Sequence, residues 1–236
     1  MQRLSSQGFV IHRRPYRETS MLIDVFTQAF GRISVVAKGV RGNTKSDRKS
    51  VLQPLQLISL ECSGKSSLKN LINAEQVNQA YACKGNALYS AFYINELLQR
   101  ALPESEAIED LYAQYVMTLA ALSELENPEL LALEPILREF EFCLLANMGY
   151  LVDISSTADT GQEILPDVTY QYVNEVGFVF SNNPSVSLIS GQSILDLQQK
   201  TYNKASLQVA KYIVRMTLPL VIGDKPLKSR ELFKKR

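Results

Sequence analysis

The sequence predicts an α+β protein of more than one domain: a five-stranded β-barrel at the N-terminus, then a mainly α-helical domain with a small irregular or β-rich insertion. Three observations predict this. The 236 residues exceed the usual size of one domain. The period of the apolar residues changes near residue 80, and the charge is unevenly distributed. We expect domains at 1–80 and 81–236, with a loop-rich insertion at about 152–190.

The barrel is predicted by five β-branched or apolar stretches, separated by turn residues, that precede residue 80. In one of them Ile33, Val35 and Ala37 fall on one face, as in a half-buried strand. Several short strands in so small a segment are typical of a closed or partly open barrel, because closure removes sheet edges, and the oligonucleotide-binding (OB) barrel is the leading candidate. The stretches are Leu4–Arg13, Ser20–Thr27, Arg32–Lys38, Val51–Cys62 and Leu68–Val77.

The helical domain is predicted by apolar residues that recur at helical spacing from Leu88 onward. We expect Ser105 to cap a helix that runs on to Leu122. Pro135 should break or kink the next helical pattern, because proline lacks the N–H that the helix needs.

The last third of the chain predicts a hairpin at 169–173 and 177–181, then a helix capped by Asn203. The face of this helix expected to be exposed carries Lys204, Gln208, Lys211 and Arg215.

The charge distribution points to nucleic acid. Residues 1–79 carry 12 Lys and Arg against 5 Asp and Glu, whereas residues 80–150 carry 3 against 11. A basic module joined to an acidic one is the simplest interpretation. Cations on the basic module would neutralise phosphates and release counterions.

The candidate DNA contacts lie in two basic segments of the barrel. The segment 38–50 is too polar to bury itself and should project from the barrel. Phe9, Tyr16 and Phe30 would offer rings on which bases stack. A solvated loop is the alternative interpretation of the same charges. The candidate residues are Arg13, Arg14, Arg17, Lys38, Arg41, Lys45, Arg48 and Lys49.

Catalytic and metal-binding patterns are weak. His12 is the single histidine, and its arginine neighbours favour a partly exposed or DNA-contacting imidazole over a general base. Cys62, Cys83 and Cys143 lack the spacing of metal ligands, and no phosphate-binding glycine motif occurs. We therefore expect no catalytic residue, metal or cofactor. Without a signal peptide or a membrane-spanning run, we expect a cytoplasmic protein that does not contact membranes.

Several motifs together resemble the family of the bacterial recombination mediator RecO. They follow one another in the family's order over nearly the whole chain. The N-terminal ones are Gly8–Ile11, Arg14–Ser20, Phe26–Thr27, Gly31 and Ala37–Arg41, and the later ones are Tyr93–Leu98, Phe140–Glu141 through Met148–Tyr150, and Lys225–Leu232.

The resemblance implies an OB barrel, a helical domain and a role in DNA repair by homologous recombination. It implies binding of single- and double-stranded DNA, annealing of complementary strands, and action with RecR to load RecA onto DNA covered by single-strand-binding protein. It also implies association with the nucleoid and no enzymatic turnover. Many members carry a four-cysteine zinc module where this chain has residues 152–190, and those cysteines are absent here.

The resemblance further implies that the helical domain docks the acidic C-terminal tail of single-strand-binding protein. Such a tail needs an apolar pocket and one well-placed cation. Arg138, beside Phe140 and Leu144, is the best candidate in this sequence. An ion pair of Arg138 with Glu134 or Glu141 is the rival explanation.

Two other functions stay open. One is a protein-only adaptor that never touches DNA. The other is a metal-dependent nuclease, although the acids of the basic segment lack clustered spacing: Glu18, Asp24, Asp47, Glu61 and Glu75.

Overall fold

The computed structural model describes residues 3–40, 48–77, 81–126 and 128–234. These residues form two compact units. The first unit comprises the described residues up to Leu133 and those from Pro226 onward, and the second unit comprises Glu134 to Lys225.

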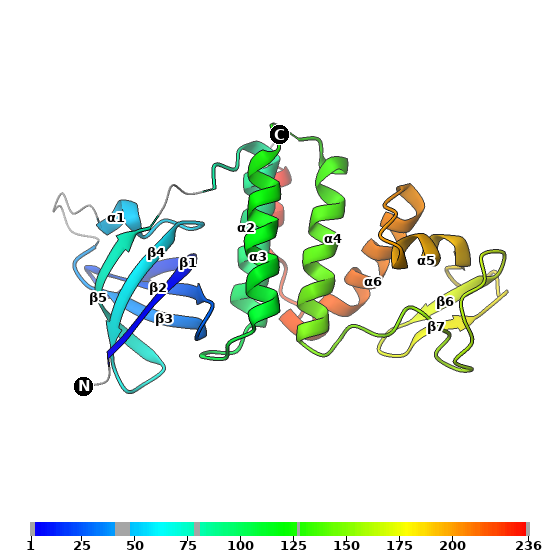
Figure 1. Ribbon diagram of the computed structural model, residues 1–236, viewed down its shortest axis with the longest axis horizontal. Coiled ribbons are helices and arrows are strands. Elements are labelled where there is room, and N and C mark those ends of the chain that lie inside the picture. Colours follow the sequence, from blue (N-terminus) through cyan, green and yellow to red (C-terminus); the bar gives the residue numbers. More distant parts are fainter. Residues whose placement is uncertain (1–2, 41–47, 78–80, 127, 235–236) are drawn as a thin grey trace. The chain divides into compact units, whose positions relative to one another are not determined.

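The first unit begins with a closed barrel of five strands in the order β1-β2-β3-β5-β4, shown from blue to cyan in Figure 1. All neighbouring strands are antiparallel except β3 and β5, which are parallel. This is the strand order of an OB barrel, so the predicted fold class is confirmed. The strands are β1 (Arg3–Tyr16), β2 (Ser20–Thr27), β3 (Gly31–Ala37), β4 (Leu57–Ser63) and β5 (Leu68–Gln76).

The fourth strand begins later than the sequence predicts. Residues 51–56 were assigned to it by their apolar character, but a short helix, α1 (Arg48–Val51), and a turn occupy this segment. The turn places Leu55 at a φ of 70° and lets its N–H donate to Val10 O at 2.8 Å. The apolar side chains enter the barrel interior from this turn, where Leu52 is fully buried.

The inner and outer faces of the barrel are both buried along β2. Met21, Ile23 and Val25 point into the barrel. On the outer face Phe26 makes edge contacts with Tyr112 and Tyr115 of the helix α3 (Glu109–Glu124), and each such aromatic pair contributes about 0.5–1.5 kcal/mol beyond burial. The helices therefore cover the end of the outer face where Phe26 lies.

The first unit also contains α2 (Gly85–Ala101), α3 (Glu109–Glu124), the start of α4 (Leu130–Asn147) and a 3₁₀ segment, η1 (Lys228–Lys234). Ser105 was predicted as the N-cap of α3, but Ile108 occupies that position. Instead the N–H of Ser105 donates to Arg32 O at 2.9 Å. The prediction was wrong because this connector bonds to the barrel rather than to its own helix.

The helix α4 is continuous through Pro135, so the expected break does not occur. Proline removes one backbone donor, which leaves only the carbonyl of Leu131 without its helical partner. That carbonyl lies in the first turn of the helix.

The second unit contains most of α4, a three-stranded sheet and two further helices. The predicted hairpin is present as β6 (Thr169–Val173) and β7 (Gly177–Phe180), and β8 (Ile189–Ser190) pairs with the other side of β6. The helix α5 (Gly191–Gln198) is capped by Ser190. The helix α6 (Lys204–Ile222) begins with a capping box between Asn203 and Ser206, which confirms the predicted cap.

By length and composition α6 could cross a membrane. Its buried face, however, belongs to the core of the second unit, where Val209, Ala210 and Ile213 pack with residues of the sheet and of α5. Its exposed face carries Lys204 and Arg215, as predicted. We therefore interpret α6 as a core helix.

Candidate nucleic-acid interface

Three cations meet at one end of the barrel. In the strand register Met21 of β2 pairs with Pro15 of β1 on one side and with Ala37 of β3 on the other. The β1–β2 turn and the residue after β3 therefore lie at the same end. This places Arg14, Arg17 and Lys38 together, and we call them the barrel-end cations.

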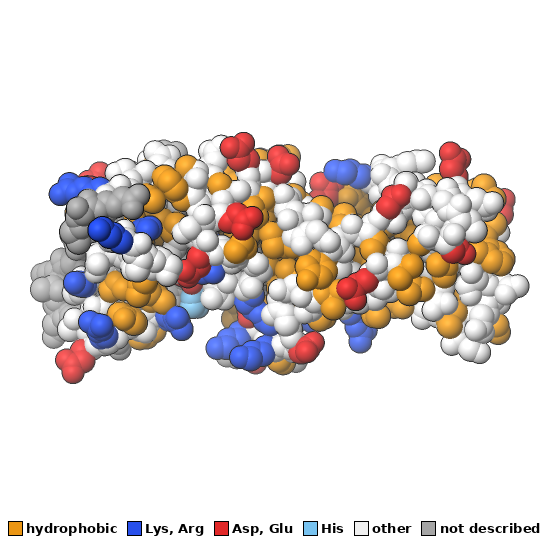
Figure 2. Space-filling model, turned by 90° about the horizontal axis from the view of Figure 1, so that it is seen from below, with side chains coloured by type: hydrophobic (Ala, Val, Ile, Leu, Met, Phe, Trp, Pro, Cys, Tyr) orange, Lys and Arg blue, Asp and Glu red, His pale blue; other side chains and the backbone are white. Residues whose placement is uncertain are grey.

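The barrel-end cations are exposed. Among the residues that the structure describes, Arg14 and Lys38 form no ion pair with an acidic side chain. The guanidinium of Arg17 lies 5.3 Å from the ring centre of Tyr16. Lys and Arg side chains are visible over the barrel at the left of Figure 2. The end of the barrel thus presents positive charge to solvent.

A β-bulge decides which arginine of β1 faces outward. The pairing with β2 shifts between Val10 and His12, so that Arg13 stands opposite Ile23 and Arg14 opposite Leu22. A bulge inserts one residue and moves the following side chains to the other face. Arg13 consequently points to the side of the barrel interior, and its Nη1 lies 3.5 Å from Leu52 O.

Of the other predicted DNA contacts in the segment 38–50, the structure describes the side chain of Lys49 alone. Lys49 is exposed on α1. Arg48 begins this helix, and its side chain lies outside the described part of the chain. Arg41 and Lys45 also lie outside the described residues, so their role stays a prediction.

Two arginines elsewhere on the barrel are paired with acids. Arg3 lies 3.1 Å from Glu61. Arg32 lies 3.6 Å from Glu104 and 3.9 Å from Asp24. This pairing leaves the positive charge at the barrel end less compensated than the charge near the helices.

Asp24 is the centre of a buried polar network on the outer face. Ser34 Oγ donates to Asp24 Oδ1 at 2.7 Å, and His12 Nδ1 lies 3.5 Å from Oδ2. Burial alone would raise the pKa of Asp24, but the hydrogen bonds from His12 and Ser34 and the charge of Arg32 outweigh it and lower the pKa. Asp24 is therefore a fixed anion that holds Arg32 and is not free to meet DNA.

The aromatic residues expected to stack on bases have different positions. Phe9 is buried, and its ring centre lies 5.3 Å from that of Tyr115. Phe30 packs against the barrel core. Phe9 was misassigned because the sequence does not reveal that α3 covers this end of the outer face. Tyr16 alone of the three lies beside the barrel-end cations.

The predicted docking residues on α4 are buried. Phe140 and Leu144 have no exposed surface. Arg138 Nη1 lies 2.6 Å from Glu141 Oε2, which is the ion pair considered as the rival explanation. In this structure the two apolar side chains offer no surface to a peptide, and docking of a partner's tail at these residues stays a prediction.

The sequence did not identify Lys65. It is exposed in the turn between β4 and β5, a loop that OB barrels use together with the β1–β2 loop to bind nucleic acid. The strand order would have pointed to it once the barrel type was known. Among the described residues no cluster of His, Cys, Asp and Glu could hold a metal ion.

An OB barrel with cations concentrated at one end, joined to helices, defines a class of nucleic-acid-binding proteins. Family models for the recombination protein O N-terminal and C-terminal domains match residues 1–80 and 84–231. The chain belongs to the RecO family of DNA repair proteins.

Relatives named DNA repair protein RecO support this assignment over nearly the full length. One from Pseudoalteromonas atlantica is 43% identical over 96% of this chain and 92% of its own length. One from Vibrio cholerae is 41% identical over 96% of this chain and 92% of its own length. The relatives' names and the family models indicate a role in DNA repair and recombination.

Proposed function

We propose that this chain is a recombination mediator that binds single- and double-stranded DNA and anneals complementary strands without making or breaking a covalent bond. With RecR it helps to load RecA onto DNA coated by single-strand-binding protein, whose C-terminal tail it binds. In this proposal the protein acts at the nucleoid, within the cytoplasm.

The convergence of Arg14, Arg17 and Lys38 at one end of an OB barrel carries this proposal. Exposed cations attract phosphates of any sequence and release their counterions. When phosphates on two strands are neutralised, the repulsion between the strands falls and complementary bases can meet. The contacts are electrostatic, so the strands can still move against one another.

Three acids of the barrel, Asp24, Glu61 and Glu75, have structural partners, which supports a function without turnover. Asp24 is held by Ser34 and Arg32. Glu61 pairs with Arg3, and Glu75 accepts a hydrogen bond from Asn73 at 2.9 Å. These carboxylates have structural partners within the barrel.

A single titration series tests the proposal. A labelled single-stranded oligonucleotide is titrated with the full chain at several salt concentrations, and the complementary strand is then added. We expect affinity to fall with salt, with a log–log slope of about −0.7 per phosphate contacted, and duplex to form from intact strands. Affinity that does not depend on salt would reject the basic surface, and strand cleavage with Mg²⁺ would reject a function without turnover. Binding without faster duplex formation would leave an adaptor rather than an annealing protein.

A further inference from the structure

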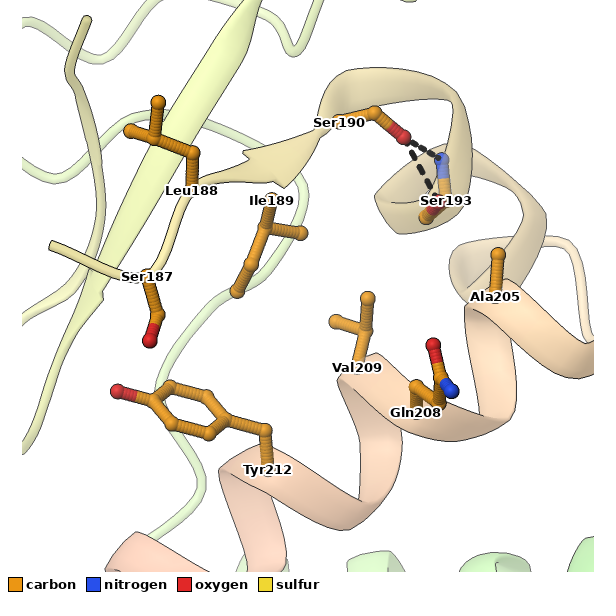
Figure 3. Close-up of a pocket in the computed structure, with 9 residues that line it drawn as sticks. All are labelled: Ser187, Leu188, Ile189, Ser190, Ser193, Ala205, Gln208, Val209 and Tyr212. Carbon is orange, nitrogen blue, oxygen red and sulfur yellow. Dashed lines mark hydrogen bonds between the residues drawn. The ribbon is translucent and has the colours of Figure 1, made fainter. Parts of the chain in front are cut away.

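The second unit contains an open cavity of about 360 Å³ between β8 and the helices α5 and α6. Figure 3 shows Val209 and Tyr212 on α6 facing Ile189 and Ser187 across the cavity, and Gln208 lies beside Val209 on the same helix. The hydroxyl of Tyr212 points toward Ser187. A cavity of this size is within the range of small-ligand sites and is large enough for one nucleobase.

The lining of this cavity is uncharged and mainly apolar, with a few hydrogen-bonding groups. Its hydrogen-bonding groups are the amide of Gln208 and the hydroxyls of Tyr212 and several serines, which include both donors and acceptors. Val209 and Ile189 supply apolar surface. The whole segment 176–195, which forms one wall, contains no Asp, Glu, Lys or Arg. Such a lining suits a neutral flat group with donors and acceptors on its edge.

A row of three basic residues and Gln208 borders the same cavity. Lys204, Gln208, Lys211 and Arg215 are spaced four, three and four residues apart, so they lie along one face of α6. All four are exposed. Lys211 pairs with Glu134 at 3.4 Å, whereas Lys204 and Arg215 form no ion pair among the described residues. Gln208 belongs both to this row and to the cavity lining.

The two features together match the chemistry of a nucleotide in a single strand. A nucleotide combines an uncharged base with a charged phosphate, and here an uncharged cavity adjoins a cationic row. An acidic peptide fits less well, because its carboxylates would enter a cavity without a cation in its lining. We infer that the second unit binds single-stranded DNA here, with one base in the cavity beside Tyr212 and phosphates further along the same strand on Lys204 and Arg215.

This inference rests on the DNA binding proposed above and adds a second contact outside the barrel. Annealing requires two strands to be held at once. A DNA contact on the second unit would hold the second strand, or would lengthen the part of one strand that the protein contacts.

Photochemical crosslinking tests the position of the base. The full chain is irradiated with an oligonucleotide that carries one 5-iodouracil, and the crosslinked peptides are identified by mass spectrometry. We expect an adduct on the peptide that contains Tyr212. Adducts confined to the barrel would overturn the inference.

Variants test the contact to the base and the contacts to the phosphates separately. Gln208→Ala should weaken binding of the intact oligonucleotide about fivefold and that of an abasic oligonucleotide much less, because it removes a contact to the base. Gln192→Ala is the matched control, since Gln192 is exposed on α5 and bonds to Asp196 outside the cavity lining. Lys204→Ala with Arg215→Ala should reduce the magnitude of the salt slope by about 1.4.

The outcomes separate this inference from the proposed function. If Arg14→Ala with Lys38→Ala weakens binding but Lys204→Ala with Arg215→Ala does not, the second site is rejected and the barrel site stands. If neither pair changes binding, DNA binding through both surfaces fails. Protection of the cavity from hydrogen exchange by an acidic peptide, but not by oligonucleotide, would assign the site to a protein partner and overturn the inference. Circular dichroism confirms that each variant is folded.

Discussion

Glu96 and Ser229 lie 133 positions apart in the chain and share two hydrogen bonds. The N–H and the hydroxyl of Ser229 donate to Glu96 Oε2 at 2.8 and 2.7 Å. The N–H of Lys228 donates to Glu96 Oε1 at 2.9 Å. A single carboxylate on α2 thus fixes the C-terminal η1 segment to the first unit.

Glu96→Ala should lower the free energy of unfolding of the first unit by about 1–3 kcal/mol, because three donors lose a charged acceptor. Thermal denaturation and proteolysis of the tail measure the effect. Lys228→Ala is the control, since it keeps the backbone N–H and removes only an exposed side chain. Equal loss of stability in both variants would show that Glu96 does not hold the tail.

The attachment of the tail should also weaken in acid. Burial would raise the pKa of Glu96, but the hydrogen bonds from Ser229 and Lys228 and the charge of Arg100 outweigh it, so the pKa is lowered. A lowered pKa means that the stabilisation is complete above the unfolded-state pKa of about 4.3 and is lost as the pH falls through the folded-state value. Tail proteolysis should therefore accelerate below about pH 4 in the native chain but change little with pH in Glu96→Gln. The same acceleration in Glu96→Gln would assign the effect to another group.

Asp24→Asn should destabilise the barrel by about 2–4 kcal/mol, because Arg32 and His12 lose the anion that they face. The pKa of Asp24 is lowered in the folded state, so its contribution is present above about pH 3.9 and disappears at lower pH. Thermal melts at pH 7 and pH 3 should then differ less for Asp24→Asn than for the native chain. Ser34→Ala, which removes one neutral donor to Asp24, should cost about 1 kcal/mol.

The barrel could be predicted from sequence because the strands alternate apolar and polar residues or consist of β-branched runs. The predictions that failed concern residues whose roles depend on contacts with residues distant in the sequence. Ser105 bonds to Arg32, and Glu96 holds Ser229, so neither role follows from the neighbouring residues. Phe9 was predicted to be an exposed ring for base stacking, because its contact with Tyr115 of α3 cannot be recognised from the neighbouring sequence.

The positions of the barrel-end cations could be predicted only in part from the sequence. The hairpin of β1 and β2 places Arg14 and Arg17 near each other. Lys38 directly follows β3, which pairs with β2 at the same end of the barrel. The orientation of Arg13 was not predictable, because the bulge at residues 10–12 reverses the alternation in β1. The cavity in the second unit depends on the approach of β8 to α6, which no local pattern records.

Gly31→Ala should destabilise the first unit by about 3 kcal/mol, more than a turn glycine usually costs. Gly31 has a φ of +60°, and a Cβ there would overlap the carbonyl oxygen of Glu106 in the connector before α3. Gly39→Ala is the control, because Gly39 has a φ of +71° and no atom of the described residues lies within 4 Å of its Cβ position, so the substitution should cost only about 1–2 kcal/mol. Chemical denaturation measures both. Equal costs would show that the connector does not pack on this turn.

Arg14→Ala should reduce the magnitude of the salt slope for single-stranded DNA by about 0.7, and Arg14→Ala with Lys38→Ala by about 1.4. The loss should be the same for oligonucleotides of different sequence, because phosphate contacts do not read bases. Arg3→Ala is the matched control: Arg3 lies on the same strand, but it pairs with Glu61 on the β4 side of the barrel. Its removal should leave the slope unchanged. A loss confined to certain sequences, or an equal loss in Arg3→Ala, would mean that DNA does not recognise the barrel end through Arg14 and Lys38.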